Sequence, residues 1–142
     1  MASPIRVRID RAQADRVAQQ HGDRLVTLAM VRTHSRASVT APVDTGNLRA
    51  LHRMNKRVGK RRVVGQVISD ANYSMAVHNG ARAHVIRARR AKALRFEQGG
   101  RIVYRSSVNH PGVRARPWLA QALASECRPL GFRVTGLPAG VI

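Results

Sequence analysis

The sequence contains few acidic residues, few lysines, few aromatic residues and a single cysteine. Of its 142 residues only seven are acidic and five are aromatic. The lone Cys127 cannot form an internal disulfide, which fits assembly in a reducing cytoplasm. No stretch approaches the roughly 18 apolar residues of a membrane span, and the N-terminus lacks the apolar segment of a secretory signal. We therefore expect a soluble, cytoplasmically made protein with a core of Val, Leu, Ile and Ala.

The sequence also offers no recognisable catalytic, cofactor or metal site. The seven acids are scattered, and the six histidines lack the short spacings of zinc ligands. No glycine-rich phosphate loop ends in Lys-Ser or Lys-Thr. A zinc finger, the aromatic strands of a single-strand binder and the tandem short helices of a helix-turn-helix are missing as well. These absences predict a protein that is not an enzyme and needs no cofactor.

Positive charge is the most pronounced feature of the composition. The net charge is +19, and 23 of the 26 basic residues are arginines. Repulsion on this scale destabilises a compact chain unless a polyanion or an acidic partner balances it. The planar guanidinium group suits phosphates and carboxylates, so the bias favours a nucleic-acid or acidic-protein partner. An arginine-rich codon bias in a GC-rich genome is the alternative, and both explanations stay open.

The N-terminal part predicts a short strand followed by a long helix. Residues Pro4–Ile9 alternate apolar and basic side chains, which is typical of a strand with one buried face. Asp10 is a suitable N-cap for a helix that extends to about Ser38, roughly 40 Å at 1.5 Å per residue. Gly22 is a position where this helix could bend. A helix this long is expected to lie across a sheet or against a neighbouring subunit.

The segment Ala41–Leu51 is predicted to be a hinge that docks a short helix. Pro42 disfavours helical geometry at the preceding residue, so the long helix should end there. Asp44 and Thr45 can accept hydrogen bonds from the free N–H groups of a helix that starts near Gly46. Two leucines three residues apart give this helix one apolar side: Leu48 and Leu51.

The middle of the chain predicts a basic hairpin. A basic run is followed by the apolar run Val63–Ile68, with Gly59 near a turn and Gly65 as a candidate bulge. The basic run contains Arg53, Lys56, Arg57, Lys60, Arg61 and Arg62. Such charges also protect a solvated strand edge from unwanted pairing. A partner-facing surface and a protected edge are therefore both consistent with the pattern.

A second basic region follows. Tyr73–Gly80 predicts a short helix that ends at a left-handed glycine, and Arg82–Arg90 is expected to be an exposed loop or arm. The segments Lys92–Phe96 and Arg101–Arg105 flank Gly99 and Gly100, whose positive φ suits a tight hairpin turn. The candidate partner contacts of this region are Arg87, Arg89, Arg90, Arg95, Arg101 and Arg105.

The C-terminal part predicts a turn, a helix and a tail. His110-Pro111-Gly112 is the turn, and Pro117 stands at the permissive first turn of the helix. Trp118 is expected to anchor the core rather than to serve as a ligand platform, and Leu119 extends the apolar face. Residues 129–142 are expected to be irregular unless a neighbour orders them.

The order of these motifs resembles a tail-component family of long-tailed bacteriophages. The family pattern is a Pro-Val-Asp-Thr-Gly-x-Leu-Arg segment after a long helix, a Tyr-centred turn, a Lys-Ala-Leu-x-Phe hairpin, and an ending with His-Pro-Gly followed by Pro-Phe-Leu or Pro-Trp-Leu. This sequence departs from it at His78 and Ala81, where the family has Glu and Thr. The matching residues are Pro42, Asp44, Thr45, Gly46, Leu48, Tyr73, Gly80, Phe96, His110, Pro111, Gly112, Pro117, Trp118 and Leu119.

The resemblance implies a structural protein of the head-to-tail connector, acting in the neck, in tail completion or as a tail terminator. It implies a homo-oligomeric ring, most simply a hexamer, around the DNA channel, with neighbouring connector or tail-tube proteins as partners and no membrane. We expect one α+β domain over residues 1–128, with the long N-terminal helix and the C-terminal helix packed on an antiparallel sheet with extended hairpins. The basic hairpins would face genomic DNA or acidic neighbouring rings. The alternative is a free cytoplasmic nucleic-acid-binding protein of packaging or regulation, and a small nuclease or other enzyme is the third hypothesis.

Overall fold

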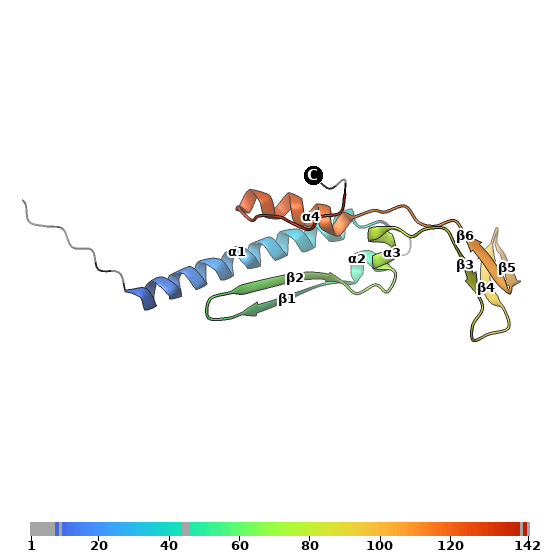
Figure 1. Ribbon diagram of the computed structural model, residues 1–142, viewed down its shortest axis with the longest axis horizontal. Helices are drawn as coiled ribbons and strands as arrows, with labels where there is room; N and C mark the ends of the chain where they lie inside the picture. Colours follow the sequence, from blue (N-terminus) through green and yellow to red (C-terminus); the bar gives the residue numbers. More distant parts are fainter. Residues whose placement is uncertain (1–7, 9, 44–45, 140, 142) are drawn as a thin grey trace, which may run out of the picture. The chain divides into compact units, whose positions relative to one another are not determined.

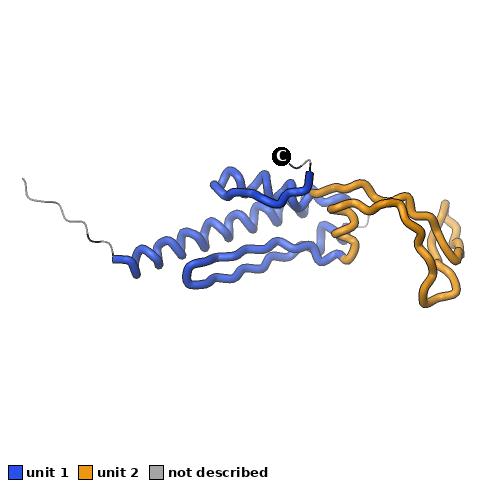
Figure 2. Tube along the Cα trace, viewed as in Figure 1, with its two compact units in different colours: residues 1–71, 118–142 blue, residues 72–117 orange. Residues whose placement is uncertain are grey.

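The computed structural model confirms an α+β fold: a long N-terminal helix and a C-terminal helix pack with small antiparallel two-stranded sheets (Figure 1). It describes residues 8, 10–43, 46–139 and 141. The contacts divide the chain into a first unit, residues 1–71 and 118–142, and a second unit, residues 72–117 (Figure 2). Within the described ranges, no helix combines the length and the apolarity that crossing a bilayer requires.

Helix α1 (Arg11–Thr40) begins and ends where local sequence signals place its ends. The Asp10 carboxylate accepts hydrogen bonds from the backbone N–H groups of Ala12 and Gln13, as an N-cap does. Gly22 does not interrupt the helix. Ala41 is the C-cap, directly before Pro42. The predicted strand Pro4–Ile9 lies outside the described residues except for the exposed Arg8.

Two opposite faces of α1 carry apolar side chains. One face is buried against helix α4 (Trp118–Cys127) and the first hairpin, and it includes Ala29, Met30, Thr33 and Ala37. At 100° per residue, a second set of apolar residues falls about opposite this face. These are Val17, Leu28, Val31 and Val39, and all four are exposed. Helix α1 therefore lacks the single apolar side of an ordinary surface helix.

Strands β1 (His52–Val58) and β2 (Val63–Ser69) form the predicted first hairpin. The pairing is unbroken from His52 opposite Ser69 to Val58 opposite Val63, so the predicted bulge at Gly65 is wrong. A Cβ on Gly65 would stand 2.4 Å from the Sδ atom of Met30 on α1. Glycine is needed here because the helix approaches the strand closely, not because the strand is irregular.

The short helix α2 (Asn47–Ala50) follows Gly46, whose φ is +86°. Leu48 is buried beneath it, but Leu51 is exposed, so the predicted apolar pair has only one buried member. The predicted capping residues Asp44 and Thr45 lie outside the described residues.

At the C-terminus, α4 is followed by the 3-10 helix η1 (Arg128–Leu130) and an irregular segment. Trp118 is 3% exposed, which confirms it as a core residue. Ala122, Ala124 and Cys127 are buried on the same helix. The core of the first unit is thus built largely from small side chains of α1 and α4, which lets the two helices approach closely.

The second unit contains α3 (Ser74–Asn79) and two small antiparallel sheets. Strand β3 (His84–Arg87) pairs with β6 (Ser107–His110), so the expected exposed arm at residues 82–90 contains a paired strand. Strands β4 (Leu94–Gln98) and β5 (Arg101–Arg105) form the predicted hairpin. Gly99 and Gly100 have positive φ, as the turn requires.

Candidate functional site

The first hairpin turns one of its basic residues, Lys56, toward α1. Alternate residues of a strand face opposite sides of the sheet, and Lys56 stands opposite Gly65 on the side that meets α1. The Lys56 ammonium lies 2.6 Å from a carboxylate oxygen of Asp23 and donates to the Thr27 hydroxyl at 2.9 Å. Lys56 therefore joins the hairpin to α1.

Arg53 is also engaged within the first unit. It forms an ion pair with Asp70, whose backbone N–H in turn donates to the Leu51 carbonyl at 2.8 Å. Both side chains are largely exposed, so the pair adds little stability. It does, however, partly neutralise the positive charge at this end of the hairpin.

The remaining basic residues of this hairpin gather at its tip. Four of them are exposed around the turn: Arg57, Lys60, Arg61 and Arg62. The turn is closed by a hydrogen bond from the Gly59 N–H to the Arg62 carbonyl at 2.7 Å, and Gln19 of α1 donates to the Gly59 carbonyl at 2.8 Å. These two hydrogen bonds hold the backbone of the tip against α1, so its charged side chains extend from a fixed position. We call these four residues the basic tip.

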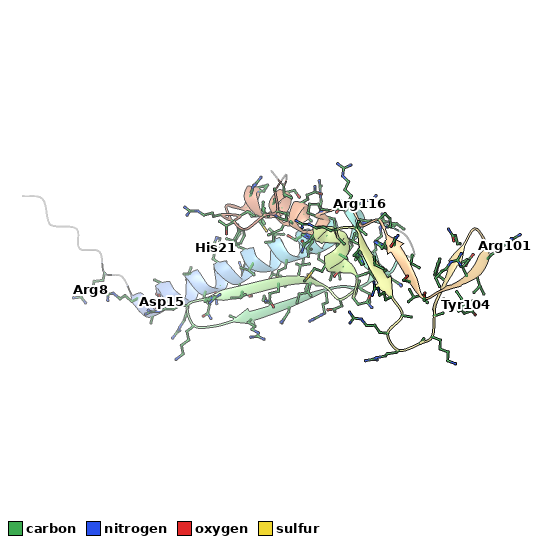
Figure 3. The ribbon with its side chains drawn as sticks, turned by 45° about the vertical axis from the view of Figure 1, so that its right-hand side comes forward. Arg8, Asp15, His21, Arg101, Tyr104 and Arg116 are labelled. Atoms are coloured by element: carbon green, nitrogen blue, oxygen red, sulfur yellow. The ribbon has the colours of Figure 1, made fainter. Side chains whose placement is uncertain are left out.

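The second unit is more basic still. It carries ten basic residues and one acidic residue, Glu97. On the β4–β5 hairpin, Arg95 lies opposite Tyr104 and Arg105 opposite Leu94. Arg101 and Tyr104 extend from this hairpin in Figure 3. The other candidate contacts, Arg87, Arg89 and Arg90, are exposed on β3 and the segment after it.

The second unit has no interior of its own. All residues from 72 to 117 are described, and none of them is buried. Seven of its large apolar side chains are exposed: Tyr73, Met75, Val85, Ile86, Ile102, Tyr104 and Val113. Isolated two-stranded sheets are at best marginally stable in water. The unit thus combines a dense positive charge with apolar surface that it cannot bury by itself.

The family-motif residues lie in both units. In the core of the first unit, Trp118 Nε1 donates a hydrogen bond to His52 Nε2 at 3.1 Å. Leu48 is buried in the same unit, and Asp44 and Thr45 lie outside the described residues. Arg49, next to Leu48 in the motif, donates to the Val39 carbonyl at 3.0 Å and so caps the end of α1. Sequence reasoning did not find His52 or Arg49 as structural residues, because both roles depend on contacts made by the folded chain.

In the second unit the motif glycines mark a close approach of two chain segments. Ala81 and Val113 exchange backbone hydrogen bonds of 2.9 and 2.8 Å. A Cβ on Gly112 would stand 2.5 Å from the Ala81 carbonyl oxygen, and one on Gly80 would stand 2.9 Å from the Val113 carbonyl oxygen. Gly80 has the expected positive φ of +79°, but its ψ of 167° is extended and not that of a left-handed helix. Tyr73, Phe96 and Pro117 are not buried within this unit.

Histidine pairs are the nearest approach to a metal site. His84 and His110 stand opposite each other on β3 and β6 with ring centroids 5.0 Å apart. Across the described residues, no three His, Cys, Asp or Glu side chains come together as metal ligands. The pair is partly occupied already, because His110 Nδ1 accepts from the Gly112 N–H at 3.1 Å.

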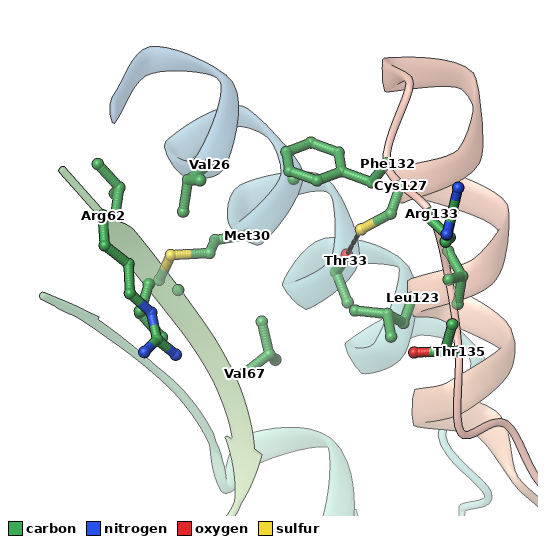
Figure 4. Close-up of a pocket in the computed structure, with 15 residues that line it drawn as sticks. Val26, Met30, Thr33, Arg62, Val67, Leu123, Cys127, Phe132, Arg133 and Thr135 are labelled. Atoms are coloured by element: carbon green, nitrogen blue, oxygen red, sulfur yellow. Dashed lines mark hydrogen bonds between the residues drawn. The ribbon is translucent and has the colours of Figure 1, made fainter. Parts of the chain in front are cut away.

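An apolar groove of about 420 Å³ lies in the first unit (Figure 4). Strand β2 forms one wall, α4 with residues 132–135 forms the other, and α1 lies between them. Val26 and Met30 line it from α1, Val67 lines it from β2, and Leu123 and Phe132 line it from the opposite wall. We call this cavity the β2 groove.

Comparison of the chain with protein-family models, with curated proteins and with solved structures gives no match.

Proposed function

We propose that this chain is a structural protein of a bacteriophage head-to-tail connector, acting in the neck, in tail completion or as a tail terminator. The observation that carries the proposal is the second unit, which has no buried residue yet holds seven large exposed apolar side chains. A protein that acts alone in solution gains nothing from such a unit, whereas a component of an assembly buries it against its neighbours. The order of the phage tail-component motifs supports the same conclusion.

The proposed assembly is a homo-oligomeric ring, most simply of six copies. A closed ring needs two different surfaces on each subunit that fit each other. The first unit offers two such surfaces. One is the exposed apolar side of α1, and the other is the β1–β2 hairpin, which packs on the opposite side of that helix. In this proposal the ring joins capsid to tail, and the protein makes and breaks no covalent bond.

The basic residues would act by charge alone. Contacts between arginine and the phosphate backbone carry no sequence information, so they suit a channel through which any genomic sequence passes. The basic tip and the β4–β5 hairpin are the candidate surfaces, and acidic faces of neighbouring rings are the other partner that their chemistry fits. A free nucleic-acid-binding protein is the competing function, because the same exposed arginines would also bind DNA without a ring.

Size and DNA affinity together distinguish these functions. The purified chain would be analysed by sizing chromatography with light scattering and by electron microscopy, followed by titration with duplex DNA at two salt concentrations. Rings, or monomers that are recruited only onto phage particles, support the connector. A monomer that binds DNA tightly and with a steep salt dependence, and that is absent from purified virions, supports the free binder.

A further inference from the structure

We infer that the β2 groove receives the N-terminal segment Pro4–Ile9 of a neighbouring copy, which adds to β2 as an extra strand. The inference rests on the proposed assembly and specifies one of its subunit contacts. It is carried by the free edge of β2, the apolar lining of the groove and the sequence pattern and reach of the N-terminal segment.

The free edge of β2 is not protected against pairing. Among the residues that the structure describes, strand β2 pairs with β1 alone, in a two-stranded sheet. Edge strands that must stay unpaired usually carry charges or proline. Strand β1 carries Arg53, Lys56 and Arg57, but β2 contains no charged residue and no proline along Val63–Ser69. Across the described part of the chain, no backbone hydrogen bond joins this edge to residues 132–135 on the far wall.

The groove beside this edge is lined mainly by apolar side chains, with Arg62 and Arg133 as its charged members. An occupant with apolar side chains on one face therefore fits most of its lining. Met30 and Val26 project from α1, Val67 from β2 and Leu123 from α4 (Figure 4). Leu123 is exposed although it lines a cavity within the unit. A strand laid along β2 would make main-chain hydrogen bonds to the edge and place alternate side chains against α1, which is the geometry of strand addition.

The N-terminal segment has the matching pattern. In Pro4–Ile9 the apolar residues Ile5, Val7 and Ile9 alternate with Arg6 and Arg8. On a strand in the groove the three apolar side chains would face α1, and the two arginines would face outward. The outward neighbours on β2 would be Val64, Gln66 and Ile68, none of which carries a charge.

The length of the N-terminal segment indicates that the segment in the groove comes from another copy. Val26, where the groove begins, is 15 residues beyond Arg11, or about 22 Å along α1 at 1.5 Å per residue. Pro4 is six residues before Asp10, which spans about 20 Å even when fully extended at 3.3 Å per residue. Part of this length is used in reversing the chain direction. The segment therefore cannot fill its own groove, and a neighbour must supply it.

The test is a disulfide between two full-length variants in which Cys127 is replaced by serine. One carries Val7→Cys and an affinity tag, and the other carries Leu123→Cys in the groove. The control partner carries Leu28→Cys, because Leu28 and Leu123 are 40% and 39% exposed but Leu28 lies outside the groove. Under mild oxidation we expect several-fold more tagged heterodimer with Leu123→Cys than with Leu28→Cys.

Equal yields with the two partners would overturn the inference. So would a cross-linked monomer, of altered gel mobility, from a single chain that carries Val7→Cys and Leu123→Cys together with Cys127→Ser. Rings seen by electron microscopy without the selective cross-link would leave the connector proposal standing and remove only this contact. Selective cross-linking without rings, for a chain that is also absent from purified virions, would keep this contact and overturn the connector proposal.

Discussion

The indole Nε1 of Trp118 donates a hydrogen bond to the Nε2 atom of His52 across 3.1 Å in the core of the first unit. Because Nε2 accepts this bond, the proton of the neutral imidazole lies on Nδ1, which donates to the Arg49 carbonyl at 3.2 Å. The His34 ring contacts the backbone carbonyl of His52 through Nε2 at 3.2 Å. One histidine thus joins α4, the end of α2 and α1.

Replacing this histidine should destabilise the first unit. His52→Ala removes two hydrogen bonds and a ring packed against Trp118, so we expect a loss of about 2 kcal/mol in the free energy of unfolding. His21→Ala on the exposed side of α1 is the matched control and should change it by less than about 0.5 kcal/mol. Urea unfolding followed by tryptophan fluorescence measures both. Equal stability of the two variants would show that the contact is not structural.

The protonation state of His52 can be observed directly. Long-range proton–nitrogen correlation spectra at neutral pH should show a protonated Nδ1 and an unprotonated Nε2 for His52. The exposed His21, by comparison, should show averaged tautomers. A His52 ring protonated at Nε2 would contradict the direction of the bond from Trp118.

The same substitution at two glycines should have opposite effects on stability. Gly65→Ala places a Cβ against Met30, and the helix or the side chain must move, so we expect a loss of about 1–3 kcal/mol. Gly22→Ala meets no atom within 4 Å in the middle of α1 and should add about 1 kcal/mol. Thermal unfolding measures both changes. Combining Gly65→Ala with Met30→Ala should cost less than the sum of the two single changes, and strict additivity would exclude the proposed clash.

Removing a charge from the basic tip should change the salt dependence of DNA binding, whereas removing the charge of the inward-facing Lys56 should not. Arg61→Gln removes an exposed charge, so the slope of log affinity for duplex DNA against log salt should fall by about 1 if the tip contacts phosphate. Lys56→Gln should leave this slope unchanged but weaken the tie between the hairpin and α1, because Lys56 pairs with Asp23. Fluorescence anisotropy with labelled DNA at several salt concentrations gives the slopes. Equal slopes for the two variants would mean that the tip is not a phosphate contact.

Backbone amide hydrogen exchange should be much faster in the second unit than in the buried part of α1. Amides of β4 and β5 in the second unit should exchange with opening free energies near 0 kcal/mol in the isolated chain, because no buried residue holds the hairpin together. Amides around Ala37 and Thr33 in α1 should exchange far more slowly. On assembly the β4–β5 amides should become protected. Strong protection of these amides in an isolated monomer would contradict our account of the second unit.

Local signals in the sequence predicted the ends of elements well. The Asp10 cap, the end of α1 before Pro42 and the turn at Gly99 and Gly100 each depend on a residue and its immediate neighbours. The buried position of Trp118 also followed from its type and from the helix around it. These features are fixed by short-range steric and hydrogen-bonding preferences, which a sequence shows directly.

Features that depend on distant contacts were predicted poorly. Strand β3 is paired only because β6, more than 20 residues later, returns beside it. Gly65 was taken for a bulge because its neighbour, Met30, lies on another element. Lys56 and Arg53 were assigned to partners because nothing in the sequence places Asp23 and Asp70 beside them. Charge alone does not tell an internal ion pair from an interaction surface.

Because α1 has an exposed apolar side as well as a buried one, the proposed association of copies would depend on ionic strength. In dilute buffer the +19 charge keeps subunits apart. At 0.1 M salt the Debye length falls to about 10 Å, so copies can approach before they repel. In the proposed assembly, the exposed side of α1, with Val17, Leu28, Val31 and Val39, would then meet apolar surface of a neighbouring copy. A polyanion or added salt would thus act as a trigger, releasing a hydrophobic attraction that electrostatic repulsion otherwise holds in check.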